Sequence, residues 1–311
     1  MLTFVCVLTN GKIEAYVRRT TTTAENDMYA ITGASGQLGQ LVIEDLLTRV
    51  APAGIVALVR DPAGLSRLAD RGVVVRPFDY DRPETLAPAL AGVDRLLLIS
   101  SSAVGQRVSQ HRAVIEAAKA AGVGHIVYTS ILRAPDSPME LAGEHRETEA
   151  AIVASGLAHT ILRNGWYTEN YTASAAPAVQ HGAMAGSAGN GRISGASRAD
   201  YAAAAATVLA EDGTANRVIE LAGDDAFTLD QFAAAIGEIA GKPVVYQDMP
   251  EADYRQMLEG VGLPAPVAAM LAESDAKAAQ GSLYDDGRAL SRLIGRPTTP
   301  WQDTLRAALQ G

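Results

Sequence analysis

The chain has 311 residues and is 48% hydrophobic, which is enough for one large core or for a main domain with a smaller lobe. Its net charge of −9 argues against a nucleic-acid-binding surface, because such a surface needs a basic patch. The single cysteine, Cys6, excludes a disulfide framework and a Cys-rich metal site and fits a cytoplasmic protein, and no apolar run reaches the roughly 18–20 residues of a membrane span.

Residues 1–27 differ from the rest of the chain. The apolar segment 2–8 is short, no basic segment precedes it and no small-residue cleavage pattern follows, so we expect no secretory signal. Threonines rather than an apolar stretch follow Arg18-Arg19, which argues against a twin-arginine signal. Because the first strand of the domain begins at Met28, itself able to start translation, we expect an extension that is poorly ordered or not native.

From Met28 onward, short apolar strands alternate with amphipathic helices. The expected strands are 29–32, 55–59, 73–75, 96–99, 125–130 and 159–163. The expected helices are 38–48, 106–121 and 141–155, and Gly122 and Gly156 end the last two. Continuously apolar strands separated by helices predict a parallel sheet covered on both faces. The fold class is therefore α/β: a Rossmann doubly wound parallel sheet with a smaller C-terminal α/β lobe.

The alternation breaks down after Asn164. Residues 182–195 are rich in Gly, Ala and Ser and are expected to form a loop. A helix over 200–210, a strand over 218–222, a helix capped by Thr228 and a strand over 244–246 are expected beyond. We assign residues 28–170 to an NADP-binding Rossmann domain and 171–311 to a mixed region, which returns to the sheet near 196–223 and otherwise forms the substrate lobe.

The turn after the first strand of this domain contains Gly33, Gly36 and Gly39. Gly33 permits the tight turn, Gly36 lets the backbone approach a pyrophosphate, and Gly39 lets the new helix pack on the strand. The pyrophosphate would sit at the helix N-terminus, where free N–H groups and the helix dipole favour negative charge. Because this turn follows a strand and opens a series of βα units, it predicts a dinucleotide site rather than an ordinary tight turn.

Arg60 ends the second strand of the domain, 21 residues (60 − 39) after Gly39. In NAD-selective sites an acidic residue about 20 residues on accepts the ribose 2′-OH. A guanidinium there suits a 2′-phosphate, so we predict NADPH; a solvated charge at the strand end is the alternative for Arg60. Pro62 indicates that Asp61 is a turn or helix-cap residue. Asp79, at the end of the third strand, is expected either to meet the adenine or to cap a helix.

Three small hydroxyl residues, Ser100, Ser101 and Ser102, follow the fourth strand of the domain. Ligands of doubly wound sheets lie at the carboxyl ends of the strands, so these serines are expected to line the nicotinamide-ribose side. A plain polar loop is the alternative.

The Tyr-x-x-x-Lys pair of many reductases on this fold is missing from the helix after the fifth strand. His145 and Glu149 have the matching spacing, and His145 is a candidate proton donor, but a Glu raises the pKa of such an acid where a Lys lowers it. A solvated or hydrogen-bonded helix histidine is the alternative. A ketone needs a general acid, whereas hydride addition to a quinone gives a delocalised, weakly basic anion that water can protonate. The missing pair therefore favours a quinone-like acceptor or no chemistry.

An aromatic segment, Asn164 to Tyr171, follows the sixth strand of the domain. Gly165 lets the chain pass closely, and Asn164 is a candidate to bond the carboxamide or the acceptor oxygen. Trp166, Tyr167 and Tyr171 can form a flat pocket for a planar ring, although core packing explains Trp166 equally well.

Several segments together are similar to a known family. They are 32–39 (Thr-Gly-Ala-Ser-Gly-Gln-Leu-Gly), 97–102 with 104–107, 162–171, 198–204 and 293–299. They resemble the type 2 NAD(P)H:quinone oxidoreductases, in the NmrA-like, atypical branch of the short-chain dehydrogenase superfamily and close to triphenylmethane reductase. The likeness runs from Met28 to near the C-terminus. Ser35 stands where Thr is common, which keeps the hydroxyl.

The resemblance implies NADPH as donor and quinones as acceptors, without flavin or metal. Carried over position by position, its cofactor contacts fall on Gly33, Ala34, Ser35, Gly36, Gln37, Leu38, Arg60, Ser100, Ser101, Ser102, Asn164, Gly165, Trp166, Tyr167, Thr168 and Glu169. These agree with the positions chosen from the residues, except that the residues alone place 166–169 on the substrate side. The family also lacks the Tyr/Lys pair.

We therefore expect an enzyme that transfers hydride from NADPH to a small-molecule quinone. The alternatives are a reductase of another planar acceptor, such as a triphenylmethane dye, and an NADP(H)-binding redox sensor of the NmrA type. No nucleic-acid partner, no membrane insertion and no metal are expected, and the sequence is compatible with a homodimer.

Overall fold

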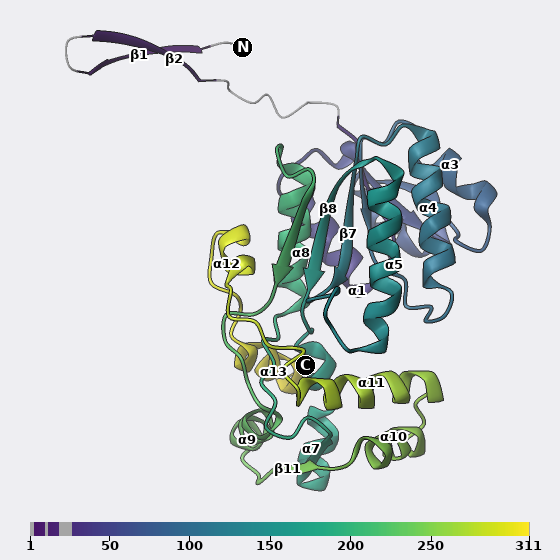
Figure 1. Ribbon diagram of the computed structural model, residues 1–311, viewed down its shortest axis with the longest axis vertical. Coiled ribbons are helices and arrows are strands. Elements are labelled where there is room, and N and C mark those ends of the chain that lie inside the picture. Colours follow the sequence, from purple (N-terminus) through teal and green to yellow (C-terminus); the bar gives the residue numbers. More distant parts are fainter. Residues whose placement is uncertain (1–2, 10–11, 19–26, 311) are drawn as a thin grey trace.

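The computed structural model describes residues 3–9, 12–18 and 27–310, and its centre is a seven-stranded sheet (Figure 1). The strands are β3 (Tyr29–Ile31), β4 (Ile55–Val59), β5 (Val74–Pro77), β6 (Arg95–Leu98), β7 (His125–Ile131), β8 (Ala158–Asn164) and β10 (Arg217–Leu221). Every neighbouring pair is parallel, in the order β10-β8-β7-β6-β3-β4-β5. The chain runs outward from β3 to β5 and then returns to β6 beside β3. The predicted doubly wound sheet is confirmed, and its switch point lies between β3 and β6.

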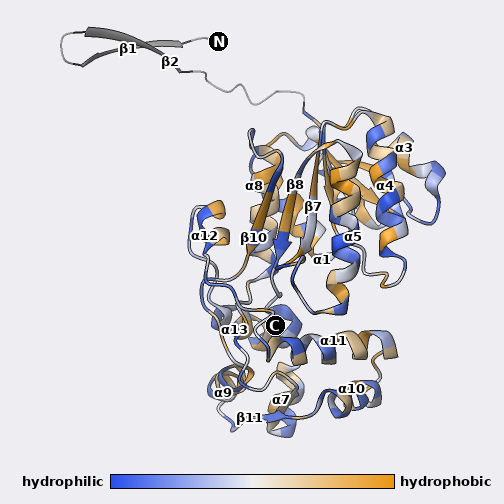
Figure 2. Ribbon diagram, in the orientation of Figure 1, coloured by the Kyte–Doolittle hydropathy of each residue, from blue (hydrophilic) through white to orange (hydrophobic). Residues whose placement is uncertain are grey.

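Helices cover both faces of this sheet. One face carries α1 (Gln37–Leu46), α8 (Arg198–Ala210) and α12 (Ala289–Ile294), and the other carries α3 (Leu86–Ala89), α4 (Arg107–Ala121) and α5 (Glu140–Ser155). The shorter connectors are η1 (Pro52–Gly54), η2 (Pro62–Leu65), α2 (Ser66–Asp70) and η3 (Pro83–Thr85). A separate apolar cluster fills each interface, and Figure 2 shows hydrophilic residues concentrated on the outer helix faces. This two-sided burial explains why the strands are continuously apolar.

Local signals place the ends of several helices correctly. Gly122 and Gly156 adopt the left-handed conformation, with φ of 76° and 77°, at the C-termini of α4 and α5. Thr228 and Gln231 form a capping box at the start of α9 (Leu229–Ala240). These predicted boundaries are confirmed.

A smaller lobe follows β8 in the chain. It comprises α6 (Glu169–Thr172), α7 (Ala175–His181), β9 (Ala183–Gly186), α9, β11 (Val245–Asp248), α10 (Glu251–Gly260), α11 (Ala265–Ala278) and α13 (Trp301–Gln310). Its own apolar cluster contains Trp166, Phe227, Phe232 and Trp301. The chain returns from the lobe to the sheet with α8 and β10.

The expected loop over 182–195 is wrong at β9, which pairs in parallel with β11. A Cβ at Gly186 would lie 2.8 Å from Leu229 Cδ1 and 3.0 Å from Asp275 Oδ2, so any larger residue would force side chains of the lobe to shift. The strand depends on a partner about sixty residues away, and its small residues therefore gave no local strand signal.

The N-terminal segment contains β1 (Thr3–Thr9) and β2 (Lys12–Arg18), which pair antiparallel with each other in a separate sheet. Residues 19–26 lie outside the described residues, and the proposal that 1–27 is not native stays a prediction. Within the described ranges, no helix is both long and apolar enough to cross a bilayer. The same ranges contain no group of three or more His, Cys, Asp or Glu side chains arranged to hold a metal ion.

Candidate cofactor site

A cavity of about 450 Å³, called here the cofactor cavity, lies at the carboxyl ends of β3, β4 and β6. Predicted residues from three separate segments line it: Gly33, Ser35 and Gly36; Arg60; and Ser100, Ser101 and Ser102. This is the switch-point position at which open α/β sheets bind their ligands. The fold therefore brings together the residues that the sequence singles out far apart along the chain.

The glycine-rich turn has a geometry that only glycine accommodates easily. Gly33 has a φ of +59°, and its carbonyl accepts the Gly36 N–H at 2.9 Å. A Cβ at Gly39 would overlap the Gly33 carbonyl oxygen and would lie 2.9 Å from Ala34 Cα. The sequence interpretation placed Gly39 against the strand, whereas the tight contact of this residue is with the turn itself.

The N-terminus of α1 is free to bind an anion. No side chain caps it, and its first turn contains no acidic residue. The first N–H groups of a helix have no intrahelical partner, so they and the helix dipole favour a phosphate here. Ala34 and Leu38 are buried in the core, and only their backbone can contribute to such a site.

Arg60 follows β4 directly and supplies a cation in the cofactor cavity. Its side chain is exposed and makes no ion pair or hydrogen bond within the described part of the chain. The neighbouring Asp61 is occupied, because its Oδ1 accepts the Ala63 N–H at 3.0 Å at the start of η2. The cap role predicted for Asp61 is therefore confirmed, and the unpaired guanidinium fits a 2′-phosphate.

The three serines after β6 are not equivalent. Ser101 Oγ donates to Gln110 Oε1 at 2.8 Å and accepts the Ala103 N–H at 3.1 Å. The hydroxyls of Ser100 and Ser102 form no hydrogen bond to any described residue. Ser101 thus holds the loop, and Ser100 and Ser102 are free to meet a ligand.

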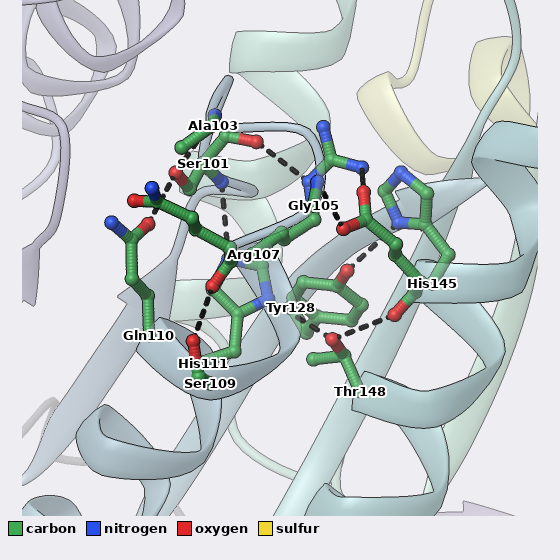
Figure 3. Close-up of polar contacts among 12 residues, drawn as sticks. Ser101, Ala103, Gly105, Arg107, Ser109, Gln110, His111, Tyr128, His145 and Thr148 are labelled. Atoms are coloured by element: carbon green, nitrogen blue, oxygen red, sulfur yellow. Dashed lines mark hydrogen bonds and ion pairs between the residues drawn. The ribbon is translucent and has the colours of Figure 1, made fainter.

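A buried polar network holds the serine loop, residues 100–102, in place (Figure 3). Arg107 Nε donates to the Ser101 carbonyl at 2.6 Å, and its Nη1 donates to Glu144 Oε2 at 2.7 Å. Glu144 Oε1 also accepts the Gly105 N–H at 2.8 Å. Helices α4 and α5 are therefore tied together through the loop that lines the cofactor cavity.

His111 completes the anchoring of the loop. Its Nε2 accepts the Ser101 N–H at 3.0 Å, so that nitrogen carries no proton, and we assign the proton to Nδ1, which lies 3.0 Å from Thr148 Oγ1. Burial, helped by the nearby Arg107 charge, lowers the pKa of His111 to about 3. The ring is therefore a neutral structural group.

His145, the candidate acid, lies between α5 and β7 and does not line the cofactor cavity (Figure 3). Its Nδ1 is 2.8 Å from Tyr128 Oη, and it is 4% exposed. Burial lowers its pKa well below the usual value, with smaller contributions from Arg107 and His111. Glu149, its predicted neighbour, instead binds Arg163 and accepts from Ser130 Oγ at 2.5 Å. The hydrogen-bonded-histidine interpretation fits this placement, and the acid interpretation gains no support.

The side chains of residues 164–167, at the end of β8 and just after it, lie in different surroundings. Asn164 Oδ1 is buried and has no hydrogen-bond partner among the described residues. A Cβ at Gly165 would lie 2.9 Å from Tyr201 Oη, which explains why the chain needs glycine there. Trp166 packs in the apolar cluster of the lobe, as the core alternative expects. Tyr167 packs edge-on against Tyr201, with ring centroids 5.4 Å apart.

Glu169 supports the start of α8, whereas the Thr168 hydroxyl does not. Both carboxylate oxygens of Glu169 accept the Arg198 N–H, at 2.9 and 3.2 Å, and Thr168 Oγ1 is buried without a described partner. Gln37 and Glu169 line a second cavity of about 900 Å³ beside the first turn of α1. None of the residues 164–169 lines the cofactor cavity, so their assignment to the cofactor stays a prediction.

The sequence interpretation missed some residues of the cofactor cavity. Tyr80, Gln106 and Gln110 line it, together with the anticipated Asp79. Tyr80 Oη is buried and unpartnered among the described residues, and burial raises the pKa of Tyr80 to about 12. Its position just after β5, at the same edge of the sheet, was the signal that could have identified it.

Comparisons with known proteins agree with this geometry. A family model described as NAD(P)H-binding matches residues 33–212. Quinone oxidoreductase 2 of Escherichia coli (strain K12) is 56% identical over 278 residues, which span 89% of this chain and 97% of that protein. Both matches cover the glycine-rich turn and the serine loop.

Solved structures similar to this chain also include complexes with NADP(H). The crystal structure of the E. coli NADPH-dependent quinone oxidoreductase QOR2 complexed with NADPH has a TM-score of 0.89 and 54% identity, covering 91% of this chain and 100% of that chain. Triphenylmethane reductase from Citrobacter sp., complexed with NADP(H), has a TM-score of 0.86 and 38% identity, covering 90% and 99%.

Proposed function

This chain belongs to the NAD(P)H-binding family, in its NmrA-like branch with the type 2 quinone oxidoreductases, and from this membership we propose that it reduces quinones with NADPH. One observation carries the cofactor part of the proposal. The N-terminus of α1, which no described side chain caps, and Arg60, which pairs with no described residue, border one cavity, where they offer sites for two separate phosphate groups.

Different residues of the cofactor cavity bind different parts of NADPH. The backbone from Gly33 to Gly36 and the N-terminus of α1 hold the pyrophosphate, and Arg60 binds the 2′-phosphate. The free hydroxyls of Ser100 and Ser102 bind the nicotinamide-side ribose. Asn164, whose side-chain oxygen lacks a described partner, orients the carboxamide or the acceptor. When bound, NADPH supplies the hydride.

The protonation chemistry of the site suits a quinone. Hydride and one proton convert a quinone to its hydroquinone, and the anion formed after hydride transfer is weakly basic, so water can supply the proton. The chain has no Tyr/Lys pair on α5, and buried His145 is held neutral next to Tyr128. The chain therefore positions the reactants without needing a strong acid.

The test is NADPH oxidation by the purified protein with a panel of quinones, a triphenylmethane dye and a simple ketone. We expect turnover with quinones and none with the ketone. Faster turnover of the dye than of every quinone would move the assignment to dye reduction. Tight NADPH binding without turnover of any acceptor would favour the redox-sensor alternative.

Two further expectations belong to this proposal. We propose that the protein acts in the cytoplasm, because its single cysteine fits a reducing compartment. We also propose a homodimer, which sedimentation equilibrium of the purified protein tests directly.

A further inference from the structure

A second, chemically different cavity of about 590 Å³, called here the lobe cavity, lies between α6, α7, β9, α10 and α11. Figure 1 shows α7, α10 and α11 gathered in the lobe, below the carboxyl ends of the strands. The apolar side chains of its wall include Trp166, Tyr171, Met184, Met257, Leu258 and Leu271. Two flexible methionines and three flat aromatic rings, Tyr254 included, form a wall that adapts to an apolar ligand.

The charges around the lobe cavity exclude an anionic ligand. Among the described residues, no Lys or Arg lines it, and the acidic or basic side chains in its wall are Asp275 and His181. The Asp275 carboxylate is buried and already bonded, because it accepts Tyr171 Oη at 2.9 Å and the Ser187 N–H at 3.2 Å. The cofactor cavity, by contrast, holds a free guanidinium. A neutral and mostly apolar group is therefore the class of ligand that fits the lobe cavity.

One wall residue of the lobe cavity lies close in sequence to Asn164, the residue proposed for the acceptor side of the site. Asn164 ends β8, and Trp166, two residues later, is already part of the cavity wall. The wall of the lobe cavity therefore begins two residues after the strand end that carries Asn164. Val261, at the end of α10, is 68% exposed although it also lines the cavity, so the apolar surface extends to solvent.

We propose that the lobe cavity binds the apolar alkyl or prenyl chain of the quinone whose ring is reduced near Asn164. This inference rests on the proposed function and deepens it, because it names chain-bearing quinones as the preferred substrates. Burial of each methylene is favourable, so transition-state binding increases with chain length until the cavity is filled.

Direct binding is measured with tryptophan fluorescence. The chain has two tryptophans, Trp166 in the cavity wall and Trp301 stacked on Phe232, so Trp301→Phe leaves Trp166 as the reporter. We expect 2-methyl-3-hexyl-1,4-naphthoquinone to quench Trp166 at a concentration about tenfold lower than 2,3-dimethyl-1,4-naphthoquinone. Equal quenching by the two probes overturns the proposal.

Turnover supplies the second measurement, with the same two quinones. The wild-type kcat/KM is expected to be about tenfold higher for the hexyl quinone. Met257→Glu places a charge in the lobe cavity and should reduce this preference to less than about twofold, while turnover of the dimethyl quinone is kept. Val267→Glu is the matched control, because Val267 is 40% exposed in the same lobe and does not line the cavity.

If Met257→Glu does not fold, Val261→Glu at the exposed mouth takes its place, with a smaller loss of preference. A chain preference that survives both variants overturns the proposal, as does its absence in the wild type when the dimethyl quinone is reduced. If no quinone is reduced, the proposed function fails, but the quenching titration still tests whether the lobe cavity binds apolar chains. If quenching depends on the alkyl chain of the quinone and Met257→Glu removes that dependence, the lobe cavity is supported as a site for apolar chains. If quenching does not depend on the alkyl chain, the proposal is overturned.

Discussion

The carboxyl edge of the sheet has two halves, which differ in whether their polar groups are already bonded to other groups of the protein. At the ends of β3, β4 and β6, Arg60 pairs with no described residue and no described side chain caps the N-terminus of α1. At the ends of β7 and β8, Arg163 binds both Glu149 and Glu220, and Glu169 binds the start of α8. Both halves carry residues that the sequence resemblance assigns to the cofactor.

This difference separates ligand-binding groups from structural groups. A polar group that the protein already satisfies contributes mainly to folding, whereas a free donor or cation in a cavity has binding energy available for a ligand. Asn164 and Thr168 are exceptions in the second half, because each has a buried side-chain oxygen without a described partner. The comparison therefore predicts which substitutions impair function and which change only stability.

Gly39→Ala tests the first half and has the largest expected effect. The added Cβ overlaps the Gly33 carbonyl, so the turn must distort at a cost of about 3 kcal/mol, and NADPH binding weakens about 100-fold. Fluorescence titration with NADPH measures this. Gly64→Ala is the control, because a Cβ there meets nothing within 4 Å. Equal effects of the two substitutions would contradict the role of the turn.

Asn164→Leu tests the first of these exceptions in the second half. We expect kcat/KM for quinone reduction to fall about tenfold, while the free energy of unfolding stays the same or rises, because an unsatisfied buried oxygen is removed. Steady-state kinetics and urea unfolding measure the two quantities. Tyr201→Phe is the control, since it removes another unpartnered buried oxygen and should leave turnover unchanged. Unchanged kinetics in Asn164→Leu would make this residue structural.

The pH dependence of stability tests the structural histidines. His111, His125 and His145 are neutral in the folded protein because burial lowers their pKa values, whereas the unfolded chain binds protons near pH 6.5. Their contribution to stability is therefore complete above pH 6.5 and is lost as the pH falls, by about 1.4 kcal/mol per pH unit for each histidine.

His145→Gln isolates one of these contributions, because the glutamine amide can donate to or accept from Tyr128 Oη as the histidine ring does. Urea unfolding between pH 7 and 5 should show a slope smaller by about 1.4 kcal/mol per pH unit below pH 6. Protonation of Asp275, whose pKa burial raises to about 6, has the opposite sign but is common to both proteins and cancels in the difference. An unchanged slope would mean that His145 titrates normally.

The same His145→Gln variant has the smallest expected effect on catalysis. Because the ring lies away from the cofactor cavity, kcat for quinone reduction should stay within about twofold of the wild type. Loss of a general acid would instead lower kcat by about 100-fold or more. A loss of that size, at pH 7, would return His145 to the acid role.

Local patterns predicted that the residues lining the cofactor cavity lie at one edge of the sheet. A strand, a glycine turn and a helix occur together within residues 29–46, and Arg60 and Ser100 directly follow strands, so their common edge follows from the parallel topology. The side-chain directions on α5 were harder to predict. His145 and Glu149 share one helix face, and only the packing of α5 on the sheet turns that face toward Tyr128 and Arg163.

The lobe was least accessible from sequence. Strand β9 is a short Ala- and Gly-rich segment whose pairing with β11 joins distant parts of the chain. The lobe cavity likewise forms only where α7, α10 and α11 meet, so no local motif marks it. Features built from long-range packing leave no periodic signal within one segment.

The most direct test of the account is the cofactor preference of Arg60→Ala. Dissociation constants for NADPH and NADH are measured for the wild type, for this variant and for Arg82→Ala, whose guanidinium forms an exposed surface pair with Glu84. Loss of charge-assisted bonds worth about 1.5–3 kcal/mol should weaken NADPH binding about 10- to 100-fold and change NADH binding less than about twofold. Equal weakening of NADPH and NADH would contradict the assignment of Arg60 to the 2′-phosphate.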